Sequence, residues 1–122
     1  MSDENTIGGS IRYKKDDIDF TRRFSSTSFD QTGVGFTHIT QEIGDIHEAL
    51  DMGNVTSSGA FAFFNNGAYN IQIGIDQVGV FVTILEIPAG GFILGTYLDI
   101  DALYAKCTDS TGSQLEAFIA QR

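Results

Sequence analysis

This chain of 122 residues has no tryptophan, a single proline, a single cysteine and few basic side chains. One cysteine, Cys107, excludes a disulfide within the chain, and its strand-like neighbours predict a buried free thiol. A fold without disulfides fits synthesis in a cytoplasm, where thiols stay reduced. One proline with 14 glycines suits many tight turns between short strands. Ten phenylalanines without tryptophan predict a core of plain aromatic rings.

Lysine and arginine are absent from residues 24–105, and the chain carries 16 acidic residues against seven lysines and arginines. Residues 1–23 hold five of each kind, so the remainder of the chain carries the whole net charge of −9. Such a body repels phosphates and anionic lipids, which argues against nucleic acid and membrane surfaces as partners. The neutral N-terminal segment reads either as solvated edge strands or as a docking segment for an acidic partner.

We also expect no segment that targets the chain to a membrane. Residues 1–6, MSDENT, are polar and acidic, so we expect no secretory signal peptide. Residues 78–98 are apolar over a length that could span a bilayer, but Glu86, Pro88 and the pair Gly90 and Gly91 interrupt them. Their β-branched residues and turn signals predict strands instead.

Residues 59–98 are the most informative stretch, because strand patterns alternate with turn signals there and only Asp76 and Glu86 are charged. We interpret them as a β-meander, with Asn66-Gly67 as a strong hairpin signal. In residues 80–87 both faces carry apolar side chains, which predicts a strand between two layers or a face covered by another subunit. The pattern puts Val80, Val82, Ile84 and Glu86 on one face and Phe81, Thr83, Leu85 and Ile87 on the other.

About nine short strands, spaced near ten residues apart, predict an all-β fold: an antiparallel β-sandwich of jelly-roll type. We expect residues 1–9 to form a flexible arm and residues 10–122 a single domain. Residues 18–29 alternate, with Ile18, Phe20 and Phe24 on one face, and Arg22 falls on that apolar face. This strand is therefore either an edge or a strand that buries Arg22 against a partner. Residues 45–52 are the only candidate helix, and an extended crossing is an equal alternative.

No catalytic or metal-binding motif stands out, so we expect no enzyme, cofactor or metal. His38 and His47 lack the further ligands that zinc needs, and Asp99, Asp101 and Asp109 lack the glycine and glutamate of a calcium loop. No nucleophile elbow or glycine-rich phosphate loop is present. A pair of carboxylates for glycoside hydrolysis stays open, because such a pair is defined only in space.

Four tyrosines could form a carbohydrate-binding platform: Tyr13, Tyr69, Tyr97 and Tyr104. Their alternation with aliphatic residues favours packing in a core or an interface over such a platform. A lectin-like glycan-binding module therefore stays as an alternative function, with Tyr69 and Tyr97 as the residues to test.

Several segments resemble small structural proteins of tailed bacteriophages. They are residues 49–55 (ALDMGNV), Gly59 with 62–66 (AFFNN), 70–74 (NIQIG), 87–90 (IPAG), 104–107 (YAKC) and 115–119 (LEAFI). These are turn and strand patterns that hold no catalytic group. The resemblance implies a non-enzymatic β-sandwich subunit of a virion, made in the host cytoplasm: a capsid decoration or cement protein, or alternatively a tail-associated one.

The partners implied are copies of the same chain, with a trimer favoured, and the major capsid protein or other virion proteins. The surplus of apolar side chains in residues 80–87 supports packing around a symmetry axis, with strand edges paired to neighbouring subunits. The residues expected at an oligomer or partner interface are Arg22, Arg23, Phe81, Leu85, Phe92 and Tyr97.

Overall fold

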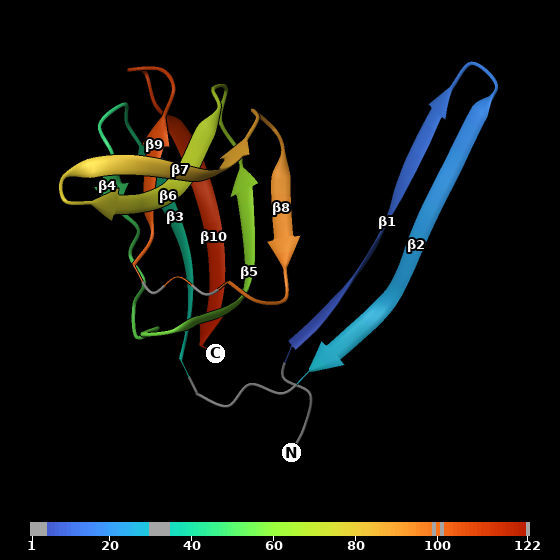
Figure 1. The fold of residues 1–122 in the computed structure, drawn as a ribbon, viewed down its shortest axis with the longest axis horizontal. Coiled ribbons are helices and arrows are strands. Elements are labelled where there is room, and N and C mark those ends of the chain that lie inside the picture. Colours follow the sequence, from blue (N-terminus) through green and yellow to red (C-terminus); the bar gives the residue numbers. More distant parts are fainter. Residues whose placement is uncertain (1–4, 30–34, 99, 101, 122) are drawn as a thin grey trace. The chain divides into compact units, whose positions relative to one another are not determined.

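The computed structural model describes residues 5–29, 35–98, 100 and 102–121, and the chain divides into two compact units, residues 1–32 and 33–122 (Figure 1). Every regular element in these described ranges is a β-strand and every pairing is antiparallel, which confirms the all-β expectation. The strands are β1 (Asn5–Lys15), β2 (Ile18–Phe29), β3 (Phe36–Ile43), β4 (Glu48–Ala49), β5 (Ser58–Asn65), β6 (Ile71–Gln77), β7 (Val80–Ile87), β8 (Phe92–Gly95), β9 (Tyr104–Cys107) and β10 (Ser113–Gln121).

The first unit is a long hairpin of β1 and β2. The strands pair from Lys15 opposite Ile18 to Asn5 opposite Phe29, with a bulge between Ile7 and Gly9. β1 therefore runs across the boundary that we expected between residues 9 and 10, and the chain divides after residue 32 instead. The polar composition of residues 5–9 does not predict a strand. They form one because pairing with β2 stabilises it. Residues 1–4 of the expected arm lie outside the described residues.

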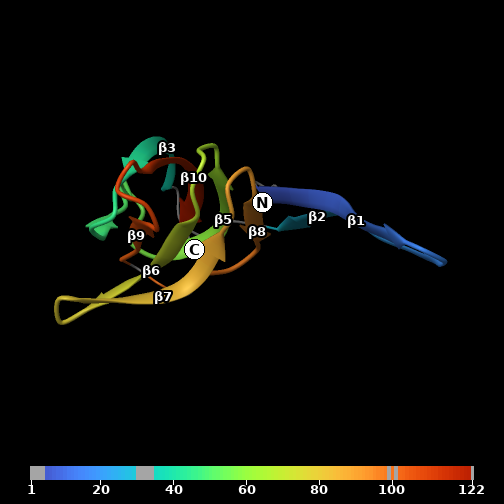
Figure 2. The ribbon, with the colours of Figure 1, turned by 90° about the horizontal axis from the view of Figure 1, so that it is seen from above.

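The second unit is a sandwich of two four-stranded sheets, in the orders β3-β10-β5-β8 and β4-β9-β6-β7. Figure 2 shows the two layers from above. The chain changes sheet at every connection except the β6–β7 hairpin. These orders are those of a jelly roll, two Greek keys wound together, so this part of the expectation is confirmed too. None of the described residues belongs to a helix long and apolar enough to span a membrane.

The core lies between the two sheets and is mainly aliphatic. Ile43, Ile73 and Leu115 are at most 1% exposed, and Cys107 is a fully buried free thiol, as expected. Each aliphatic side chain of this size contributes about 1.5–3 kcal/mol when it is fully buried. The expectation of a phenylalanine-rich core is wrong: only Phe61 and Phe63 are buried among the phenylalanines whose side chains the structure describes.

Residues 59–98 do not form a meander. β5 and β6 lie in different sheets, so the turn at Asn66 and Gly67 carries the chain from one layer to the other. The cause is Asn65, which is 1% exposed. Its amide nitrogen donates to the carbonyls of Tyr69 (2.7 Å) and Ile87 (3.0 Å). Its oxygen accepts from the Gly67 backbone (3.1 Å) and the Ser113 hydroxyl (2.7 Å), so contacts distant in sequence replace the hairpin.

The structure selects one of the two alternatives for residues 45–52 and corrects the expectation for residues 80–87. Residues 45–52 are extended, because Glu48 and Ala49 pair with β9 and the Leu50 backbone donates to the Leu103 carbonyl at 2.9 Å. In β7 a bulge shifts the pairing opposite Ile73 and Gly74, and one extra residue reverses the alternation. The two faces expected for residues 80–87 are therefore exchanged halfway along the strand.

Candidate interaction surfaces

The outer face of the sheet β3-β10-β5-β8 carries a group of apolar side chains, beside the polar His38, Thr40, Glu42 and Gln114. The register places six apolar side chains there, which we call the phenylalanine face: Phe36, Ala62, Phe64, Phe92, Leu94 and Phe118. Phe36 and Phe92 are 60% and 61% exposed. The ring of Phe36 lies 6.3 Å from that of Phe118, and the ring of Phe64 lies 5.9 Å from that of Phe92. Aromatic rings therefore cover both halves of this outer face of the sandwich unit.

Two carboxylates, Glu42 and Glu116, lie on the same outer face, and Glu116 is the one beside the phenylalanine rings. Glu116 of β10 lies between Thr40 of β3 and Phe64 of β5. Its carboxylate accepts hydrogen bonds from His38 Nε2 at 2.8 Å and from the Asn66 side chain at 3.3 Å. These bonds, the one from His38 first, hold the pKa of Glu116 below its ordinary value. The phenylalanine face consequently carries a fixed negative charge beside its rings.

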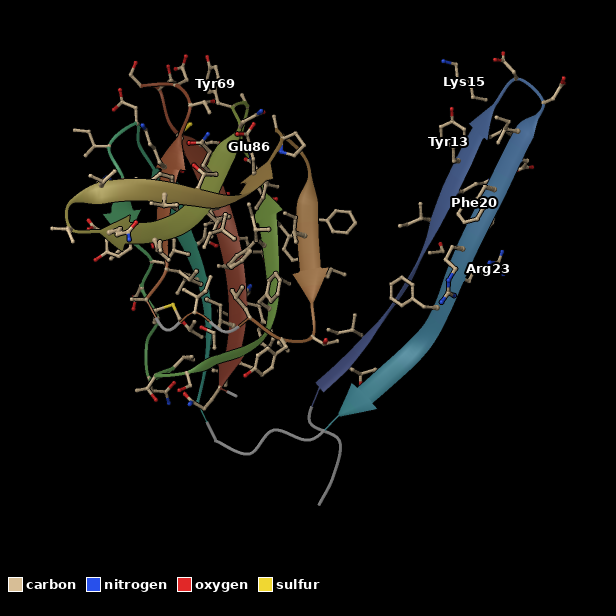
Figure 3. All side chains as sticks on the ribbon, in the orientation of Figure 1. Tyr13, Lys15, Phe20, Arg23, Tyr69 and Glu86 are labelled. Carbon is tan, nitrogen blue, oxygen red and sulfur yellow. The ribbon has the colours of Figure 1, made fainter. Side chains whose placement is uncertain are left out.

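The outer face of the other sheet is polar in comparison. There Glu86 accepts hydrogen bonds from Gln72 at 3.0 Å and Asn70 at 3.1 Å, which lower its pKa. Figure 3 labels Glu86 on β7. Lys106 of β9 pairs with Gln72 along the same row. A solvated outer face of this kind is usual for an antiparallel sandwich, so the phenylalanine face departs from the pattern that the same molecule follows on its opposite side.

The β1–β2 hairpin presents a second apolar surface. Pairing and strand alternation put seven side chains on one side, which we call the hairpin face: Ile11, Tyr13, Lys15, Ile18, Phe20, Arg22 and Phe24. Ile11 is 64% exposed, Ile18 is 59% and Phe20 is 54%. Figure 3 labels Tyr13 and Phe20, which face each other across the two strands. A two-stranded hairpin alone is marginally stable in water, so this surface calls for a covering partner.

The opposite side of the hairpin is polar. Arg12 and Asp19 form an exposed ion pair at 3.2 Å. Thr21 and Arg23 share this side with them, since successive residues of a strand point to opposite faces. The hairpin is therefore amphipathic across its width, with Arg22 among the apolar residues and Arg23 among the polar ones.

His47 is the centre of a side-chain cluster on the outer face of the sheet β4-β9-β6-β7. Its Nε2 lies 2.8 Å from Asp76 Oδ2, and its ring stacks on Phe81 at 5.5 Å and meets the edge of Tyr104 at 5.8 Å. The bond from His47, and then one from the Gly79 backbone, lower the pKa of Asp76. No three histidine, cysteine or acidic side chains gather as metal ligands among the described residues. The cluster therefore ties strands together and holds no site for zinc.

The other candidates for chemistry lie apart. His38 and His47 are on the outer faces of different sheets, so they share no site. Asp109 accepts a hydrogen bond from the Thr111 backbone at 2.8 Å and thereby closes a turn, whereas Asp99 and Asp101 lie outside the described residues. A shallow hollow of about 490 Å³ between β3 and β4 has one ionisable lining residue, Asp51. That hollow offers no pair of carboxylates.

The tyrosines do not assemble into a platform. Tyr69 follows the end of β5, where its carbonyl accepts the Asn65 bond, and Figure 3 labels it there. Tyr97 precedes Leu98, whose backbone nitrogen donates to Gly59 at the start of β5, 3.0 Å away. The two exposed tyrosines of the sandwich therefore lie at opposite ends of one strand. Tyr104 packs against His47, and Tyr13 belongs to the hairpin face.

The six residues expected at an interface are spread over several surfaces. Only Phe92 belongs to the phenylalanine face, and Arg22 belongs to the hairpin face. Arg23 lies on the polar side of the hairpin, Phe81 stacks on His47, and Tyr97 follows β8. Leu85 packs against the core, because it alternates with the buried Ile87 on the inner face of β7. Whether these residues meet a partner stays a prediction.

Five members of the phenylalanine face were not expected at an interface: Phe36, Ala62, Phe64, Leu94 and Phe118. A signal was present in β5, where Ala62 and Phe64 alternate with the buried Phe61 and Phe63, so both faces of that strand are apolar. Only the strand order shows that the outward residues of four strands join into one surface.

No protein-family model, curated protein or solved structure matches this chain. The resemblance to phage structural proteins therefore rests on the turn and strand sequences alone.

Proposed function

We propose that this chain is a non-enzymatic structural subunit that assembles with copies of itself, as a capsid decoration or cement protein of a tailed bacteriophage. The observation that carries the self-assembly is the phenylalanine face. Contiguous apolar surfaces of this kind mark interaction sites in soluble proteins, whereas scattered apolar residues do not. Its members project from all four strands of one sheet, while the other sheet keeps a polar outer face.

The virion setting rests on the resemblance of the turn segments. The jelly-roll order is compatible with it, but the same order occurs in lectins and cupins, so the fold is an analogy only. Assembly is the better-supported function, because the exposed tyrosines needed for a glycan platform are separated, whereas the exposed phenylalanines are contiguous. A trimer is the favoured oligomer.

Light scattering coupled to size-exclusion chromatography tests self-assembly on the full chain. We expect a mass three times that of the 13.2 kDa chain. Phe92→Ser should raise the dissociation constant of the oligomer about tenfold or more if the ring is central to the interface. Ile46→Ser is the matched control, because Ile46 is 79% exposed and lies outside the phenylalanine face. A wild-type monomer at every concentration would overturn the proposed function.

The virion setting has its own test. Particles purified by density gradient from cells that carry the gene should contain the chain when their proteins are identified by mass spectrometry. Added purified chain should also sediment with particles that lack it. Assembly in solution without any chain on the particles would leave a self-assembling protein and refute the decoration role.

A further inference from the structure

We infer that the β1–β2 hairpin covers the phenylalanine face of a second copy of this chain. The inference rests on the proposed function and names the surfaces that join the copies. One surface is the hairpin face, with Phe20 at its middle, and the other is the outer face of the sheet β3-β10-β5-β8, with Phe92 on β8.

Both surfaces are apolar, sheet-like and incomplete by themselves. Within the described residues of its own unit the hairpin is a single two-stranded layer, so its apolar side chains stabilise it only when another surface covers them. The phenylalanine face is the outer surface of a paired four-stranded sheet, against which a second sheet packs at about 10 Å. Placing one on the other adds a third layer and removes both exposed apolar surfaces from water.

Charge makes the two surfaces complementary. The hairpin face holds Lys15 and Arg22 beside its rings, and the phenylalanine face holds Glu116 beside Phe64. The distribution along the chain follows the same division: residues 1–32 hold five of the seven basic residues, whereas residues 33–122 hold ten acidic residues and two basic ones. Arg22 on an otherwise apolar strand face thereby gains a partner of opposite charge.

Symmetry explains why the hairpin covers a second copy of the chain. When each copy donates its hairpin to the next, every hairpin face and every phenylalanine face in a closed ring is covered by one contact repeated. Exchange of an identical element between subunits is a low-cost route to such rings. If the hairpin covered the phenylalanine face of the same chain, the result would be a monomer, because the surface proposed for assembly would already be covered. The hairpin and the sandwich are each compact units, as an exchanged element requires.

Cysteine cross-linking tests the arrangement directly. Phe20→Cys and Phe92→Cys chains are co-expressed, one of them tagged, and the purified oligomer is treated with a short bismaleimide. We expect cross-linked pairs that contain one chain of each kind. The native chain is a background control because Cys107 is buried. Thr21→Cys with Phe92→Cys is the matched control, since Thr21 lies on the polar side of the hairpin, and its yield should be at least about tenfold lower.

A chain with both Phe20→Cys and Phe92→Cys separates the remaining outcomes. Cross-links between chains support the inference, and cross-links confined to one chain of monomer mass overturn both the inference and the proposed function. A wild-type oligomer whose Phe20 and Phe92 positions never cross-link overturns the inference and leaves self-assembly standing.

Charge reversal gives a readout that simple loss of packing would not give. Arg22→Glu and Glu116→Arg should each raise the dissociation constant of the oligomer about tenfold. The double variant should assemble more tightly than either single variant, because the opposite charges are restored. Arg23→Glu, on the polar side of the hairpin, should leave assembly unchanged. A double variant as weak as the two single effects combined would contradict the pairing of these surfaces.

Discussion

His47 Nε2 lies 2.8 Å from Asp76 Oδ2 and joins the segment before β4 to β6, two parts of the sheet that β9 separates. The imidazole stacks on Phe81 and makes a T-shaped contact with Tyr104 of β9. The edge strand β4 has only two residues and therefore few backbone hydrogen bonds to its neighbour. The bond between His47 and Asp76 gives this short strand a further attachment to the sheet. The same carboxylate also accepts a bond from the Gly79 backbone at 2.7 Å, which anchors the β6–β7 turn.

The bond to His47 should make Asp76 a pH-dependent source of stability. A carboxyl whose pKa is lowered in the folded state stabilises the protein above its unfolded pKa, and that contribution is lost as the pH falls through the folded value. We expect Asp76→Asn to unfold at a lower urea concentration than wild type at pH 7. The difference should shrink as the pH falls below 3.8, the ordinary value for this group. A difference between the two urea midpoints that stays constant as the pH falls from 7 to well below 3.8 would contradict this prediction.

Val78 at the tip of the β6–β7 hairpin adopts a conformation that valine disfavours. Val78 and Gly79 both have positive φ, 53° and 82°, which indicates a turn that favours Asn followed by Gly. The side chain is 97% exposed, and Figures 1 and 2 show the hairpin extending beyond the rest of the sandwich. Val78→Asn should therefore raise the free energy of unfolding by about 0.5–1 kcal/mol, measured by urea denaturation. Val80→Asn, in the adjoining strand, should give no such gain.

Gly74 lies where the bulge in β7 brings the backbones of β6 and β7 together. A Cβ at this position would overlap the carbonyl oxygen of Val82, which belongs to backbone and yields little. We expect Gly74→Ala to lower the free energy of unfolding by about 1–3 kcal/mol. Gly44→Ala is the matched control, because no atom lies within 4 Å of the Cβ it would introduce. Equal urea midpoints for the two variants would refute this close approach.

Asn65 fixes the crossing from β5 to β6 through four hydrogen bonds from one buried side chain. Asn65→Ala removes them all and leaves buried partners unsatisfied, so the free energy of unfolding should fall by at least about 2 kcal/mol. The neighbouring Asn66→Ala is the comparison, because Asn66 is exposed and bonds Glu116 at 3.3 Å. Denaturant midpoints that fall equally in both variants would show that the crossing does not depend on Asn65.

Prediction from the sequence succeeded for strand content and for the faces of strands without a bulge, and it failed where a bulge or the combination of strands decides the arrangement. The shared face of Ile18, Phe20 and Phe24, with Arg22 among them, follows from alternation and is present in the hairpin. Phe81 and Leu85 were predicted to share one face of their strand, but they lie on opposite faces, because a bulge between them inserts one residue. No local sequence pattern signals that bulge. The phenylalanine face was missed because Phe36, Phe64 and Phe118 come from strands far apart in the chain.

The sequence alone determined that this protein is an acidic, disulfide-free, all-β chain, because charge, cysteine count and alternation are properties of short segments. Tertiary structure decided which strands became neighbours and, through them, which apolar residues were left on the surface. Phe63 and Phe64 illustrate the division: they are adjacent in β5, but Phe63 is buried in the core, whereas Phe64 stacks on Phe92 outside it. The reason is that burial depends on the second layer, and only long-range pairing places that layer against one face of the strand.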